Sequence, residues 1–110
     1  MTHQGLGEFE QVVLLAILQL KGDVYGVPIV EEIERRTGRS VSRAAVYVTL
    51  RRLEQKGLVS SWLGEPTAER GGKARRCVRI EPAGVALLRE SRRVLDRMWS
   101  GLGATPGKAG

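Results

Sequence analysis

The stretch that most constrains this chain is residues 42–59, SRAAVYVTLRRLEQKGLV, which has the pattern of a helix followed by a strand. Apolar side chains recur at four-then-three spacing and share one helical face: Val46, Leu50 and Leu53. Basic and aromatic side chains recur every four residues on a neighbouring face: Arg43, Tyr47 and Arg51. Ser42 can cap this helix, and Gly57 can end it in a left-handed conformation. A helix that buries one stripe and exposes a basic stripe is suited to a DNA groove.

The positive charge is concentrated in the middle of the chain, which carries a net charge of +6 over 110 residues. Residues 1–34 hold one basic and six acidic residues, residues 35–79 hold twelve and three, and residues 80–110 hold five and three. This segregation favours a polyanionic partner, with a solvated basic face as the alternative. The length allows one domain with a modest core, to which dimerisation would add stability.

The cysteine content and the N-terminal pattern indicate where the protein acts. A single cysteine, Cys77, excludes an internal disulfide framework and is typical of a reducing compartment. The apolar run 12–18 is too short to span a bilayer. Glu8 and Glu10 precede it, where a signal peptide would carry positive charge. We therefore expect a cytoplasmic protein without a targeting segment.

Periodicity predicts the elements and their order along the chain. Helices are expected at residues 8–20, around Pro28 up to Gly38, at 42–56 and at 82–102; strands are expected at 58–63 and 74–80, joined by the loop 64–73. This order predicts a mainly α fold with a small β-hairpin, a winged helix-turn-helix over residues 8–81. The helix 82–102 would be an extra dimerisation element. Residues 1–7 and 103–110 are expected to be a flexible start and a disordered tail.

The expected elements also have predicted faces. The first helix is apolar nearly all round, so a second subunit is expected to cover part of it. In the second helix the inner face is predicted to be Ile29, Val30 and Ile33, and the side chains facing water Glu31, Glu32, Glu34, Arg35 and Arg36. In the returning strand, Val78 and Ile80 are expected to face one way, and Arg75, Cys77 and Arg79 the other.

Five short motifs together resemble one known family. In chain order they are Leu6-Gly7-Glu8-Phe9-Glu10, Tyr25-Gly26, the stretch 47–59, Gly71-Gly72-Lys73 and Pro82-Ala83-Gly84. Over about residues 6–90 they resemble the PadR-like transcriptional regulators. The resemblance implies a bacterial winged-helix repressor that binds palindromic operators as a dimer, with the C-terminal helix supplying much of the dimer contact. The short C-terminal helix resembles the smaller members of the family.

The chain departs from the family pattern at two places. Many relatives carry paired aromatics in the second wing strand, where this chain has Cys77 and Val78. We interpret Cys77 as a small buried thiol, with a redox switch beside Arg75 and Arg79 as the alternative. Relatives often have Thr or Ser before the Pro-Ala-Gly motif, where Glu81 is a poorer helix cap.

The candidate DNA-binding residues come from the basic helix and the wing: Ser42, Arg43, Ala44, Tyr47, Arg51, Arg70, Gly72, Lys73 and Arg75. The N-terminal turns of a recognition helix reach base edges, so Arg43 could bond guanine and Ala44 could meet a thymine methyl. Tyr47 could contact the DNA backbone or be a half-buried structural aromatic. Wing cations, which also include Arg76, could approach phosphates or the minor groove, with a solvated loop as the alternative.

A second candidate surface combines the first and last helices. Its residues are Phe9, Val12, Leu95, Met98 and Trp99. Across a two-fold axis they could enclose a flat aromatic ligand or simply pack as a dimer core. The resemblance adds that some relatives sense aromatic compounds at this place.

These features predict a homodimeric DNA-binding repressor. One alternative is a regulator released from DNA by a small aromatic compound at the dimer interface. The other is a protein-interaction winged helix that does not bind DNA. No Ser/His/Asp set, no metal-ligand spacing and no phosphate loop can be assembled from the sequence, so we expect neither an enzyme nor a bound cofactor or metal.

Overall fold

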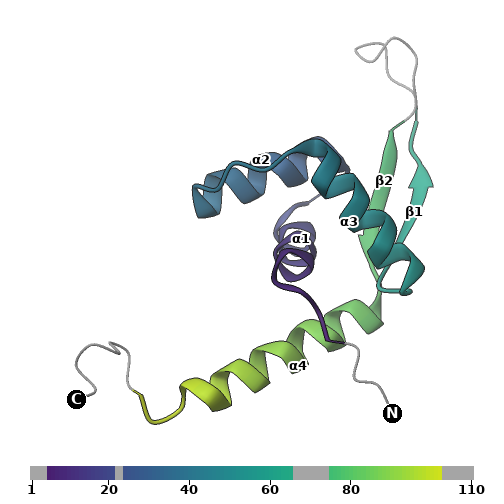
Figure 1. The fold of residues 1–110 in the computed structure, drawn as a ribbon. Helices are drawn as coiled ribbons and strands as arrows, with labels where there is room; N and C mark the ends of the chain where they lie inside the picture. The colour runs from purple at the N-terminus through teal and green to yellow at the C-terminus, as the bar shows by residue number, and fades with distance from the viewer. Residues whose placement is uncertain (1–4, 22–23, 66–74, 103–110) are drawn as a thin grey trace.

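The computed structural model describes residues 5–21, 24–65 and 75–102. Its elements are, in order, α1 (Glu8–Gln19), α2 (Gly26–Thr37), α3 (Arg43–Gln55), β1 (Val59–Leu63), β2 (Arg76–Ile80) and α4 (Pro82–Trp99). Figure 1 shows α1 at the centre, with α2 and α3 packed around it and the β-hairpin beside α3, while α4 runs away from this body. The predicted fold class, mainly α with a two-stranded hairpin, is confirmed. The wing tip and tail predictions concern residues outside those described.

Local sequence signals set the helix boundaries around α3. Ser42 Oγ accepts a hydrogen bond from Ala45 N at 3.0 Å, which caps the first turn as predicted. Gly38 ends α2 with φ of 71°, and Gly57 follows α3 with φ of 77°, both in the left-handed region. Leu58 N then donates to Leu53 O at 2.9 Å, so the chain leaves α3 in the direction of β1.

The core lies between α1, α2, α3 and the inner face of the hairpin. Its buried apolar residues include Val13, Leu14, Ile29, Ile33, Val46, Leu53, Leu58 and Val78. The predicted inner stripes of α2 and α3 are therefore the ones that pack, because each element buries the face on which apolar side chains recur. Among the described residues, no helix combines the length and hydropathy needed to cross a membrane.

The hairpin has a third, short partner that the sequence did not predict. β1 and β2 pair antiparallel, with Val59 opposite Ile80 and Leu63 opposite Arg76. On the other edge of β2, Val78 N donates to the carbonyl of Val24 at 2.8 Å, which forms an isolated bridge. This bridge ties the segment before α2 to the second strand of the wing.

Close approach between α4 and the hairpin depends on Gly84. A Cβ built there would lie 2.6 Å from Leu58 O and 2.8 Å from Ile80 Cγ1, so only glycine fits. Glu81 makes no side-chain cap, as its poor capping preference suggests, but it accepts a hydrogen bond from Ser60 Oγ at 2.5 Å. The Pro-Ala-Gly motif therefore anchors the start of α4 on the strands.

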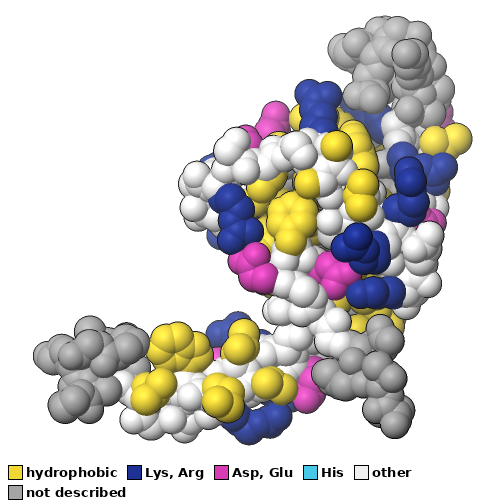
Figure 2. Space-filling view, in the orientation of Figure 1, with side chains coloured by type: hydrophobic (Ala, Val, Ile, Leu, Met, Phe, Trp, Pro, Cys, Tyr) yellow, Lys and Arg dark blue, Asp and Glu magenta, His cyan; other side chains and the backbone are white. Residues whose placement is uncertain are grey.

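The remainder of α4 extends away from the body. Only Gly84 and Leu88 of this helix are buried, and Figure 2 shows apolar side chains along its exposed length. The helix ends at Trp99, three residues before the predicted end, and Leu102 N donates to Trp99 O in the turn that follows.

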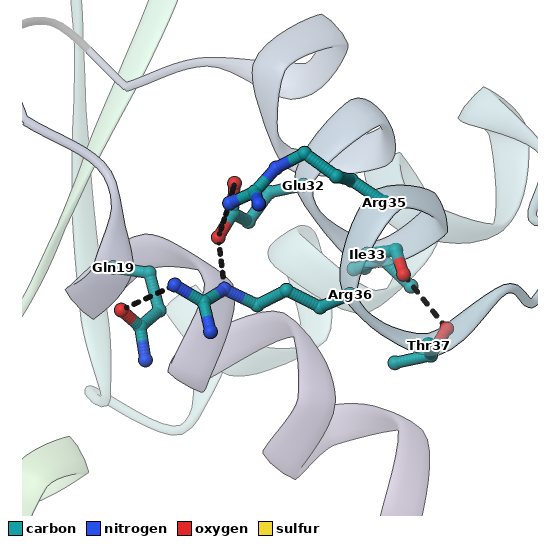
Figure 3. Close-up of polar contacts among 6 residues, drawn as sticks. All are labelled: Gln19, Glu32, Ile33, Arg35, Arg36 and Thr37. Carbon is teal, nitrogen blue, oxygen red and sulfur yellow. Dashed lines mark hydrogen bonds and ion pairs between the residues drawn. The ribbon is translucent and has the colours of Figure 1, made fainter.

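One predicted surface residue is buried. Glu32 was expected to face water, yet its side chain is only 8% exposed, so that prediction was wrong. Its carboxylate accepts hydrogen bonds from Arg35 Nη2 at 2.8 and 2.9 Å and from Arg36 Nε, and Arg36 also donates to Gln19 of α1 (Figure 3). These hydrogen bonds, Arg35 foremost, lower the pKa of Glu32 and keep it charged. The polar cluster links α2 to α1 beside the apolar core.

Candidate nucleic-acid interface

The first turn of α3 presents an exposed, partly basic surface. Arg43 and Ala44 are exposed, whereas the Ser42 hydroxyl is engaged in capping its own helix. Within the described part of the chain, no carboxylate forms an ion pair with Arg43 or Arg51. Neither guanidinium is neutralised by an ion pair within the described residues, which suits a phosphate-binding surface.

Tyr47 is a half-buried aromatic that packs on α2, which was one of the two interpretations of this residue. Its contact with the DNA backbone stays a prediction. A Cβ built at Gly26 would lie 2.4 Å from Tyr47 Cε1 and 2.6 Å from its Oη. The ring thus lies directly on the glycine that opens α2, which gives the Tyr25-Gly26 motif a steric reason. Tyr47 is still 45% exposed, and it shares a helical face with Arg43 and Arg51.

A groove of about 390 Å³ separates α3 from the hairpin. Its lining is Tyr47, Leu50, Arg51, Glu54, Ser61, Arg76 and Val78. Arg76 Nη1 donates to Ser61 Oγ at 3.0 Å, and Ser61 Oγ donates to Glu54 Oε2 at 2.9 Å. Lys and Arg side chains gather over this side of the molecule in Figure 2. Basic side chains of both α3 and β2 therefore line this groove.

The predicted wing residues divide into two groups. Arg70, Gly72 and Lys73 lie outside the described residues. Arg75 is described, and it faces the body of the protein: its guanidinium carbon lies 4.6 Å from the centroid of the Tyr25 ring. Its Nε is buried without a hydrogen-bond partner among the described atoms. Arg75 is thus partly desolvated against an aromatic ring.

Arg39, in the loop before α3, is paired rather than free to bind phosphate. Its guanidinium donates to Glu8 at 3.1 and 2.8 Å, which joins this loop to the start of α1. The hydrogen bond from Arg39 lowers the pKa of Glu8 and raises that of Arg39. The pair is well exposed, so it orients the loop and adds little stability.

A second surface lies between α1 and α4, where a groove of about 540 Å³ is open to solvent. Its apolar lining includes Leu15, Leu18, Leu95 and Trp99. Leu95, Met98 and Trp99 are exposed, as the dimer hypothesis requires. Phe9 and Val12, in contrast, are partly buried against the core. Leu15 and Leu18 are instead the large apolar residues that α1 exposes, and they were not among the residues predicted for this surface.

In the part of the chain that the structure describes, no cluster of side chains is able to hold a metal ion. A short-linked pair of helices, an exposed basic second helix and an adjacent hairpin define a winged-helix DNA-binding protein.

The family follows from comparison with known proteins. The model of the "Transcriptional regulator PadR-like family" matches residues 14–90, and the chain belongs to this family. The resemblance inferred from its motifs is therefore confirmed, and the protein is a DNA-binding transcriptional regulator. The family assignment favours this class over an interaction module that does not bind DNA.

Individual relatives agree with this assignment. The chain is 39% identical over 94 residues to "Transcriptional regulator Rv3488" of Mycobacterium tuberculosis, covering 83% of each chain. A PadR family transcriptional regulator from Eggerthella lenta is 26% identical, with a TM-score of 0.66 over 87% of this chain and 83% of that one. A transcriptional regulator from Clostridium thermocellum shares the fold at 24% identity, with a TM-score of 0.67 over 82% and 84%.

Proposed function

We propose that the protein is a homodimeric repressor that binds a palindromic operator. In each subunit α3 enters a major groove, the wing lies on the adjacent backbone, and α1 with α4 forms the two-fold interface. The observation that carries this proposal is the exposed first turn of α3, with Arg43, beside a groove lined by Arg51 of α3 and Arg76 of the hairpin. The site of action is the cytoplasm, where the DNA of a bacterium lies.

The residues of this surface have distinct roles in the proposal. Arg43 reads a guanine through its O6 and N7 atoms, and Ala44 allows close approach or contacts a thymine methyl. Tyr47 and Arg51 contact the sugar-phosphate backbone and set the register of the helix. Arg70, Gly72 and Lys73 of the wing add backbone or minor-groove contacts.

Selection of bound sequences from a random DNA pool, at about 0.15 M salt, tests this proposal. The mass of the complex is determined on the selected site. We expect an inverted repeat bound by two protomers, with half-sites about one or two helical turns apart. Binding should also fall steeply with salt. Equal affinity for selected and scrambled duplexes would contradict operator recognition.

A second function is favoured by the groove between α1 and α4. Its apolar walls and Trp99 suit a small aromatic compound whose binding releases the protein from DNA. Titration with a panel of aromatic compounds should then quench Trp99 fluorescence and dissociate the operator complex. A Trp99→Phe variant, which keeps Trp62 as an internal control, should lose the quenching. Quenching that persists in this variant would place the compound elsewhere.

A further inference from the structure

We propose that Arg76 is the residue at the base of the wing that contacts DNA phosphate, and that Ser61 and Glu54 position it. Its neighbour Arg75 instead fastens the hairpin to the body. This inference rests on the proposed DNA-binding surface and assigns its cations. The two adjacent arginines carry the same charge, but in this proposal Arg76 contacts DNA and Arg75 has a structural role.

Strand geometry separates the two arginines. Successive side chains of a strand point to opposite faces, so Arg76 shares the face of Val78, and Arg75 shares that of Cys77 and Arg79. The groove beside α3 is lined by Arg76 and Val78. Arg75 lies over Tyr25, on the other side of the strand. Only Arg76 therefore points to the side on which the recognition helix lies.

A two-step hydrogen-bond chain holds the Arg76 guanidinium. Ser61 accepts from Arg76 Nη1 at 3.0 Å and donates to Glu54 Oε2 at 2.9 Å. The carboxylate can only accept and the guanidinium can only donate, so the direction of both bonds is fixed. Ser61 takes one of five guanidinium N–H groups, which leaves donors for a phosphate.

The groove supplies a place for that phosphate. Arg51 and Tyr47 of α3 and Arg76 of β2 all line this groove. A phosphate between helix and wing would receive donors from both elements. Glu54 would repel it, but its carboxylate is engaged by the Ser61 hydroxyl and lies behind Arg76 in the hydrogen-bond chain. The hydrogen bonds thus hold the Arg76 guanidinium in one orientation at the groove.

Affinity for a labelled duplex of mixed sequence, measured at several salt concentrations, tests the assignment. Arg76→Ala should weaken binding about fivefold near 0.15 M salt and reduce the salt slope by about one. Arg79→Ala is the matched control, because it removes the same charge from the same strand, on the face where Arg79 lies over Trp62. It should leave the slope close to that of the wild type. Arg75→Ala should lower the unfolding temperature and change the slope little.

The positioning role of Ser61 is tested without changing charge. Ser61→Ala should weaken binding less than Arg76→Ala and have no further effect in the Arg76→Ala background, whereas Ser61→Thr should restore the wild-type affinity. Additive effects of the two alanine substitutions would overturn the positioning role. Equal slopes for Arg76→Ala and Arg79→Ala would overturn the contact. Failure of the wild type to bind any duplex would instead refute the proposed function itself.

Discussion

Glu10 is a buried carboxylate at the junction of α1 and the end of α3. It accepts hydrogen bonds from Lys56 Nζ and from Gly7 N, each at 2.9 Å. Burial acts to raise the pKa of Glu10, but the bonds from Lys56 and Gly7 outweigh it, so its pKa lies below the ordinary 4.5. A lowered folded-state pKa means that the charged form stabilises the fold above about pH 4.5. This contribution is lost as the pH falls further.

Glu10→Gln should therefore lower the free energy of unfolding by about 1–2 kcal/mol at neutral pH, because a charge-assisted bond becomes a neutral one. The loss should shrink toward pH 3, where wild-type Glu10 becomes protonated, as urea unfolding at a series of pH values would record. Glu8→Gln is the matched control, since its pair with Arg39 is exposed and should contribute little at any pH. An identical pH profile for both variants would refute the role of Glu10.

Some structural features could be predicted from single residues of the sequence, and others could not. Ser42, Gly38 and Gly57 act through local backbone chemistry, so their positions alone predicted where α3 begins and where α2 and α3 end. Glu32 could not be placed in this way, because its burial results from the packing of α2 in the folded protein and not from a local backbone signal. The alternation of side chains along the strand predicts that Arg75 and Arg76 lie on opposite faces. Their charge alone does not indicate which of them contacts DNA.

The start of α4 packs closely against the hairpin because Gly84 has no side chain. In most helix interiors Gly→Ala stabilises by up to about 1 kcal/mol. Gly84→Ala should instead destabilise by about 2–3 kcal/mol, because the new methyl group meets the backbone carbonyl of Leu58 and cannot be relieved by rotamer changes. Chemical denaturation measures this directly. At Gly7 the nearest atom is 3.7 Å away, so Gly7→Ala should cost less; a larger loss there would argue against steric control at Gly84.

In the proposed complex α3 makes two kinds of DNA contact, and single substitutions at its exposed residues can separate them. Arg43→Ala should relax base preference at one position in each half-site, by about 1–3 kcal/mol, while leaving binding to other sequences nearly unchanged. Arg51→Ala, two turns further along α3, should weaken binding to all sequences alike. Competition between the selected site and single-base variants distinguishes these outcomes. Uniform weakening by Arg43→Ala would rule out direct readout.

The whole molecule is extended beyond what one core requires. Its radius of gyration is 16.5 Å, against about 13 Å for a compact chain of this length. The excess reflects α4, whose second half leaves the body (Figure 1). The sequence predicted a dimerisation helix over residues 82–102. It could not separate Leu15 and Leu18 from Phe9 and Val12, because α1 is apolar all round and only packing decides which side remains open.

That apolar surface leads to a prediction about assembly. Leu95→Glu should yield a monomer, because a carboxylate would be buried against the second subunit, while Leu95 is 52% exposed in a single chain and its replacement should leave the fold intact. Affinity for a palindromic site should fall by about 100-fold or more, because the two half-sites would no longer be bound by linked subunits. Ala86→Glu places the same side chain on the opposite side of α4 and should remain dimeric. Light scattering measures the mass of both variants in solution. A dimeric Leu95→Glu, or a wild type that is monomeric at high concentration, would show that α4 binds another partner.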